Sequence, residues 1–93
     1  MHEIGSVAAR VPVISGEVGE LPTATAGCSY SFSPAFTAWA DSVHVSYVAF
    51  DWDVWRTCDA LITDYGGTPT VPYGQGWHDH LLAARQAARG DSR

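Results

Sequence analysis

The stretch of sequence that decides the fold is residues 11–20, Val11-Pro12-Val13-Ile14-Ser15-Gly16-Glu17-Val18-Gly19-Glu20. Val13 and Ile14 are β-branched, which suits a buried parallel strand better than an exposed one. Pro12 has no N–H group to donate to a sheet, so it predicts the first residue of the strand. We therefore predict a strand near residues 11–16, with Glu17 where the strand gives way to a loop. In α/β sheets and barrels that is the end at which ligands bind.

A helix and a second strand follow. Ser33 suits an N-cap and Pro34 suits the first helical position. An apolar stripe at i, i+3, i+4 and i+7 then predicts a helix near residues 34–43. The stripe consists of Phe36, Trp39, Ala40 and Val43, so we interpret Trp39 as a core residue and not as a ring that stacks on a ligand.

Residues 45–50 are uncharged and rich in β-branched and aromatic side chains, which predicts a strand near residues 45–51. A strand, a helix and another strand make a βαβ unit with parallel strands and a right-handed crossover. That connection brings Glu17 and the Asp51-Trp52-Asp53-Val54-Trp55 stretch to the same rim of the sheet.

The last predicted element is a helix near residues 74–89. Its apolar stripe consists of Trp77, Leu81, Ala84 and Ala88. Arg85 and Arg89 favour the end of a helix through its dipole, and Gly90 is a typical stop. Residues 1–10 give only weak helix signals. The order of elements therefore predicts the α/β class, as a βαβα unit with parallel strands.

Composition and charge exclude several functions. The chain has 93 residues, 46% of them hydrophobic, which suits one small domain or part of a larger one. The net charge is −5 with no Lys and no basic cluster, so we expect no nucleic-acid partner. No apolar run approaches the roughly 18 residues of a membrane span, so we expect no membrane partner. His78 and His80 would point to nearly opposite sides of a helix, which argues against a metal site.

Several segments, in this order and spacing, resemble a known enzyme family. Residues 12–20 combine an apolar strand with Gly-Glu and a following Gly, and residues 45–58 give an aromatic-rich strand, a Trp-containing loop and a Cys. Residues 61–70 follow, and Tyr73-Gly74-Gln75-Gly76 begins a helix. This pattern resembles strands seven and eight of the retaining β-glycanases of glycoside hydrolase family 5, which include the cellulases. The likeness runs from about Val11 to about Leu82.

The resemblance implies that residues 1–93 are a partial catalytic domain, the C-terminal quarter of a (β/α)8 TIM barrel. It implies hydrolysis of β-glucosidic bonds in a polysaccharide such as a β-glucan, with Glu17 as the catalytic nucleophile. It also implies that Trp52 and Trp55 bind substrate, that no cofactor or metal is needed, and that the parent enzyme is extracellular. The chain itself shows no signal peptide. Two departures are Phe50, where relatives often have Trp, and the added length at Val71-Pro72.

The acid/base residue that a retaining mechanism needs is missing from the pattern. The resemblance implies an Asn-Glu motif at the end of the fourth strand, but this sequence has no Asn, and its other glutamates are Glu3 and Glu20. Glu20 follows Glu17 in a loop, where we expect it to be more mobile. We therefore expect the isolated chain to be inactive, and to associate with the missing N-terminal part of the barrel or with itself.

Two alternatives remain open. The first is a small carbohydrate-binding module that uses Trp52, Trp55 and Tyr30 as a stacking platform, with Glu17 as a polar group at its rim. The second is an inactive structural remnant whose aromatic rings all lie in the core.

The two cysteines lie after the two predicted strands, Cys28 after the first and Cys58 after the second. Both are therefore expected in loops at the same end of the sheet. In an extracellular hydrolase two such cysteines are normally oxidised. We predict a Cys28–Cys58 disulfide in the parent enzyme, with two free thiols as the alternative.

Overall fold

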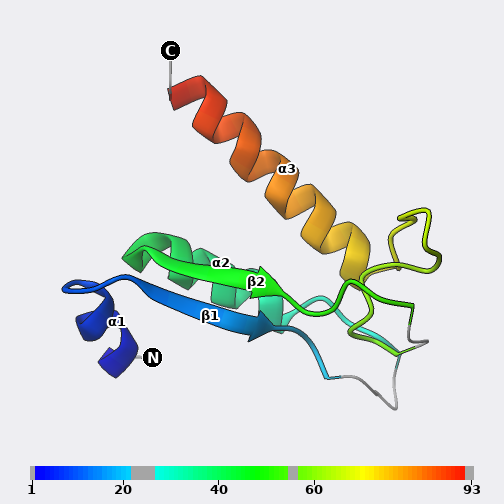
Figure 1. The fold of residues 1–93 in the computed structure, drawn as a ribbon, viewed down its shortest axis with the longest axis horizontal. Helices are drawn as coiled ribbons and strands as arrows, with labels where there is room; N and C mark the ends of the chain where they lie inside the picture. The colour runs from blue at the N-terminus through cyan, green and yellow to red at the C-terminus, as the bar shows by residue number, and fades with distance from the viewer. Residues whose placement is uncertain (1, 22–26, 55–56, 92–93) are drawn as a thin grey trace.

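The computed structural model describes residues 2–21, 27–54 and 57–91. The elements follow the order α1 (His2–Ala8), β1 (Val13–Val18), α2 (Phe32–Val43), β2 (Val45–Ala49) and α3 (Tyr73–Asp91) (Figure 1). The predicted α/β class and the βαβα order are confirmed. Helix α1 is an additional short element that the sequence indicated only weakly. In the described part of the chain, no helix is both long enough and apolar enough to cross a membrane.

Strands β1 and β2 form a two-stranded parallel sheet, as predicted. The paired residues are Val13 with Val45, Ile14 with Ser46, Ser15 with Tyr47 and, after a shift in register, Val18 with Ala49. Gly16 and Glu17 therefore stand opposite the single residue Val48. Two residues opposite one is a β-bulge, which changes the direction in which the strand presents its side chains.

Helices cover one face of this sheet and leave side chains on the other face exposed. The face that carries Tyr47 is covered by helices, since the Tyr47 hydroxyl is 2.9 Å from Oδ1 of Asp41 in α2 and 2.8 Å from Nε2 of His80 in α3. On the opposite face Ile14 is 68% exposed and Val48 is 54% exposed. The expectation that β1 is a buried strand is therefore wrong for Ile14. β-Branched residues indicate a strand, but they do not determine whether another segment covers its face.

The core lies at the C-terminal ends of the strands, where α3 begins. Val18, Tyr73 and Trp77 are almost completely buried, and the partly buried Tyr30 and Leu61 are among the residues that pack against them. The Tyr73 hydroxyl donates toward two carbonyl oxygens, that of Val18 at the end of β1 and that of Phe50 directly after β2. This side chain thus fastens the start of α3 to both strand ends.

Two glycines in the first turn of α3 make this packing possible. A Cβ atom on Gly74 would overlap the Leu61 carbonyl, and one on Gly76 would overlap the Tyr30 ring. The backbone of α3 can therefore approach its neighbours only where the side chain is absent. Local packing therefore explains why both glycines are present in the Tyr-Gly-x-Gly segment.

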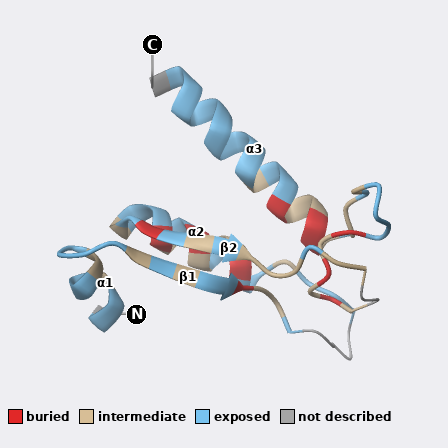
Figure 2. Cartoon of the chain, viewed as in Figure 1, coloured by how far each residue is buried: buried red, intermediate tan, exposed pale blue. Residues whose placement is uncertain are grey.

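Helix α3 is buried only at its start. Its first turns hold Tyr73 and Trp77, but every side chain described after His80 is exposed, and the helix runs away from the sheet (Figure 2). The expected apolar stripe along α3 is therefore correct for Trp77 and wrong for Leu81, Ala84 and Ala88. The periodicity predicts a helix with one apolar face, but no described segment covers that face beyond the second turn.

Helix α2 packs against β2 and against α1. Trp39 is half-buried, with its ring 5.7 Å from the Phe36 ring and next to Gly5 of α1. This is the position of a packing residue, as the apolar stripe predicted.

Candidate active site

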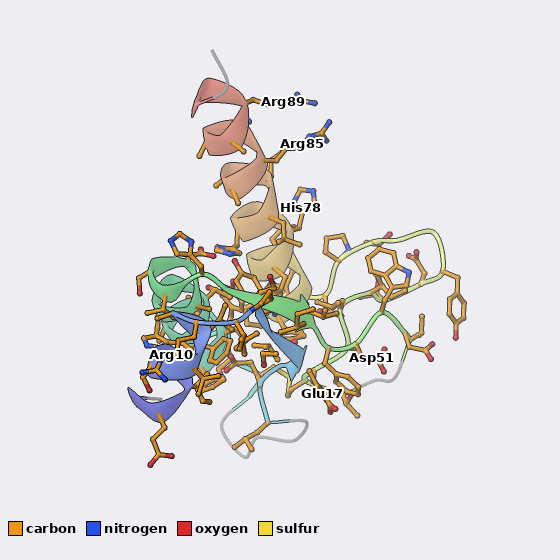
Figure 3. The ribbon with its side chains drawn as sticks, turned by 60° about the vertical axis from the view of Figure 1, so that its left-hand side comes forward. Arg10, Glu17, Asp51, His78, Arg85 and Arg89 are labelled. Carbon is orange, nitrogen blue, oxygen red and sulfur yellow. A yellow bond between two sulfur atoms is a disulfide. The ribbon has the colours of Figure 1, made fainter. Side chains whose placement is uncertain are left out.

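Glu17 lies in the bulge of β1, one residue before the strand ends. The strand continues through Val18, so the expectation that Glu17 begins a loop is wrong by about one residue. Its side chain is exposed and has no hydrogen bond or ion pair with any described residue (Figure 3). A carboxylate in this setting is accessible to a ligand.

The two glycines near Glu17 have different surroundings. A Cβ on Gly16 would meet nothing within 4 Å, whereas one on Gly19 would lie 3.1 Å from the Tyr73 hydroxyl. Gly19 therefore leaves room for the Tyr73 side chain in the core. Packing of Tyr73 explains the glycine at position 19, and access to Glu17 does not.

Glu20 is held in place by the start of α2. Its Oε1 atom accepts hydrogen bonds from the backbone N–H groups of Ser31 and Phe32, both at 3.2 Å, and from the hydroxyls of Ser29 and Ser31 at 3.1 and 3.4 Å. Its Oε2 atom accepts the N–H of Ser33 at 2.6 Å and the Ser33 hydroxyl at 2.7 Å. The expectation that Glu20 is the more mobile glutamate is wrong.

These contacts make Glu20 the cap of α2. Helix α2 begins at Phe32, and Ser31 at the N-cap position makes no side-chain cap bond. Ser33, expected as the N-cap, lies within the first turn and is completely buried. The first N–H groups of a helix have no acceptor within the helix, and here they donate to the Glu20 carboxylate at the end of the preceding strand. The negative charge of this carboxylate also interacts favourably with the positive end of the helix dipole.

The pKa of Glu20 follows from this arrangement. Burial raises it, but the hydrogen bonds from the Ser33 side chain and backbone and from the Ser31 and Phe32 backbone outweigh burial, and the pKa is lowered below 4.5. A general acid in a retaining glycosidase needs the opposite shift, so that it keeps its proton near neutral pH. Glu20 is therefore unsuited to the acid role.

Two tyrosine hydroxyls of the core do not replace that acid either. Burial raises the pKa of Tyr73 to about 12, against a smaller opposing effect of the Trp77 indole. Burial and the hydrogen bond to Asp41 raise the pKa of Tyr47 to about 12. A hydroxyl with a pKa of about 12 is too weak an acid to give up its proton near neutral pH, so both groups act as structural hydrogen-bonding groups.

The aromatic residues proposed as substrate contacts lie in different places. Trp52 is 68% exposed, and its ring lies beside Gly67, at the edge of a cavity next to α3 whose lining includes neither Glu17 nor Glu20. Trp55 lies outside the described residues. Tyr30 packs edge-on against Tyr73 and Trp77 in the core, so it does not belong to an exposed platform.

The cysteines that the sequence paired form a disulfide in the structure, Cys28–Cys58. It joins the segment after β1 to the segment after β2, across 30 residues of sequence. Both loops at the C-terminal ends of the strands are thereby tied together, close to the residues that hold Glu20.

Within residues 2–21, 27–54 and 57–91, no group of three or more His, Cys, Asp or Glu side chains could hold a metal ion. His78 pairs with Asp79 at 3.1 Å and His80 with Tyr47. The two histidines thus have separate partners, in agreement with their spacing.

Comparisons with protein-family models, curated proteins and solved structures give no match to this chain. The assignment to a glycanase family therefore stays a prediction from the sequence.

The residue that sequence reasoning missed is Glu20 in its capping role. Three serines at alternate positions, Ser29, Ser31 and Ser33, are the pattern that indicates it, because each offers a hydroxyl donor close to the start of a helix.

Proposed function

We propose that this chain is the C-terminal part of a retaining β-glycanase catalytic domain and that Glu17 is its nucleophile. The observation that carries the proposal is the accessible Glu17 carboxylate in a bulge at the C-terminal end of a parallel strand. That is the end of a (β/α)8 barrel at which active sites are built.

The cover of the sheet supports the same proposal. In a barrel the helices form an outer ring and the inner face of each strand packs against other strands. Here the helices cover the face that carries Tyr47, while Ile14 and Val48 on the other face are exposed. A sheet with helices on one face and exposed apolar side chains on the other suits the wall of a barrel.

The chemistry divides between this chain and the rest of the domain. A retaining mechanism uses two carboxyl groups about 5–5.5 Å apart, and the nucleophile attacks the anomeric carbon to form a glycosyl ester. In this proposal Glu17 attacks, because its carboxylate is exposed, whereas the Glu20 carboxylate is occupied by its contacts with α2. The acid that protonates the departing oxygen must then come from another segment of the domain, and the isolated 93 residues are expected to be inactive.

The test is to trap the intermediate in the complete enzyme that contains this segment. A 2-deoxy-2-fluoro β-glucoside with a good leaving group should form an ester that turns over slowly, and peptide mapping should find the sugar on Glu17. Glu17→Gln should abolish labelling, whereas Glu20→Gln should retain it in the folded fraction. A label on another residue, or inversion of the anomeric configuration in the product, would remove Glu17 from this role.

A further inference from the structure

A cavity of about 370 Å³ lies between the first half of α3 and the loop at residues 61–70. Its walls include the apolar side chains of Trp52, Ile62, Leu81 and Leu82. This volume falls within the range of about 300–1,000 Å³ typical of sites for small molecules. The cavity is separate from Glu17, which does not line it.

The polar side chains at this cavity are basic. His78 and Arg85 line it, and no Asp or Glu among the described residues does. Both project from the same side of α3 (Figure 3). His78 has an exposed neighbour, Asp79, at 3.1 Å. Arg85 has no hydrogen bond or ion pair with the described residues. A cationic edge on a chain with a net charge of −5 selects for an anionic group.

The apolar lining also indicates the chemistry of the uncharged part of the ligand. A sugar carries hydroxyls that each need a hydrogen-bonding partner, and leaving one buried without a partner costs roughly 1–3 kcal/mol. The walls of this cavity are mostly apolar and offer few such partners. The exposed face of the Trp52 indole favours a flat ring, since aromatic pairs gain attraction beyond the area that they bury.

We propose that this cavity binds a small aromatic carboxylate, with its ring between Trp52 and Leu81 and its carboxylate at the Arg85 guanidinium. The guanidinium offers two parallel N–H donors to a carboxylate, which fixes the orientation of the ligand as well as its charge. The site shares Trp52 with the sugar contacts expected from the resemblance, but neither Glu17 nor Glu20 lines it, so its binding can be tested separately from the proposed catalysis.

The test is a nuclear magnetic resonance titration of the disulfide-intact chain with 2-naphthoate and with the uncharged 2-naphthamide. Naphthoate should bind roughly tenfold more tightly than the amide, a ratio typical of one charge-assisted contact. The largest shifts should map to the indole N–H of Trp52 and to the amides of residues 78–85.

Matched variants separate charge from ring contact. Arg85→Gln should reduce the affinity for naphthoate to that for naphthamide, whereas Arg10→Gln, the same change at an exposed site outside the cavity, should leave both unchanged. Trp52→Ala should weaken both ligands, and Glu17→Gln should affect neither. Equal binding of acid and amide, shifts elsewhere, or no saturable binding of either compound would overturn the proposal.

Discussion

Glu17 and Glu20 stand three residues apart at the end of the same strand, and their carboxylates have opposite surroundings. Glu17 is exposed and without a partner among the described residues, whereas Glu20 accepts hydrogen bonds from three backbone N–H groups and three serine hydroxyls. The difference arises from what the fold brings to each side chain, since the residue type is the same. It separates a group available for chemistry from a group that holds the fold.

The largest effect is expected for Glu20→Ala. The change leaves the first N–H groups of α2 without their acceptor and removes the link between β1 and α2. Loss of a helix cap costs about 0.5–2 kcal/mol, and we expect a value near the top of this range because the carboxylate also binds the buried Ser33. Urea unfolding with the disulfide intact measures the change.

Glu20→Gln is the matched control, since it keeps the shape and one acceptor oxygen. It should cost less than Glu20→Ala. If Glu20→Ala unfolded at the same urea concentration as the wild type, Glu20 would not be a structural group.

The next effect concerns pH. The pKa of Glu20 in the folded chain is lowered below its ordinary value of 4.5, so the carboxylate contributes stability that is fully present above pH 4.5. That contribution is lost as pH falls through the folded pKa, because the folded state must then take up a proton that its hydrogen bonds oppose.

The measurement is the difference in free energy of unfolding between wild type and Glu20→Gln from pH 7 to pH 3. The difference should be constant down to about pH 5 and should shrink below 4.5. The lowered pKa values of Asp53, Asp64 and Asp79 apply to both proteins and cancel. A difference that grows on acidification would contradict the lowered pKa.

The comparison also shows how far the sequence could predict this molecule. The apolar periodicity near residues 34–43 and the β-branched runs predicted helix α2, both strands and their parallel pairing, because these are local properties joined by a chirality rule. Exposure of Ile14 and Leu81 could not be predicted, since burial depends on which other segment covers a face. Glu20 was missed for the same reason: its donors lie at least nine residues further along the chain.

A smaller and more local effect is expected at the serines that bind Glu20. Ser33→Ala removes a 2.7 Å hydrogen bond at a completely buried position and should cost about 1 kcal/mol. Ser31→Ala removes an exposed contact of 3.4 Å and should cost about 0.5 kcal/mol. The ratio of the two, measured by urea unfolding, tests whether Oε2 carries most of the capping. Equal effects would show that it does not.

The smallest effect on stability is expected for Glu17→Gln, and this is what makes Glu17 a candidate for catalysis. Its carboxylate has no partner in the described structure, so removal of its charge should change the free energy of unfolding by less than about 0.5 kcal/mol. In the complete glycanase that we propose, the same change should abolish turnover of a β-glucan while the melting temperature stays the same. A structural glutamate gives the reverse pattern, as expected for Glu20→Gln, with lower stability and activity retained in the folded fraction. If Glu17→Gln lowered stability as much as Glu20→Ala, its exposed position in the bulge would serve the fold, and the nucleophile would have to lie elsewhere.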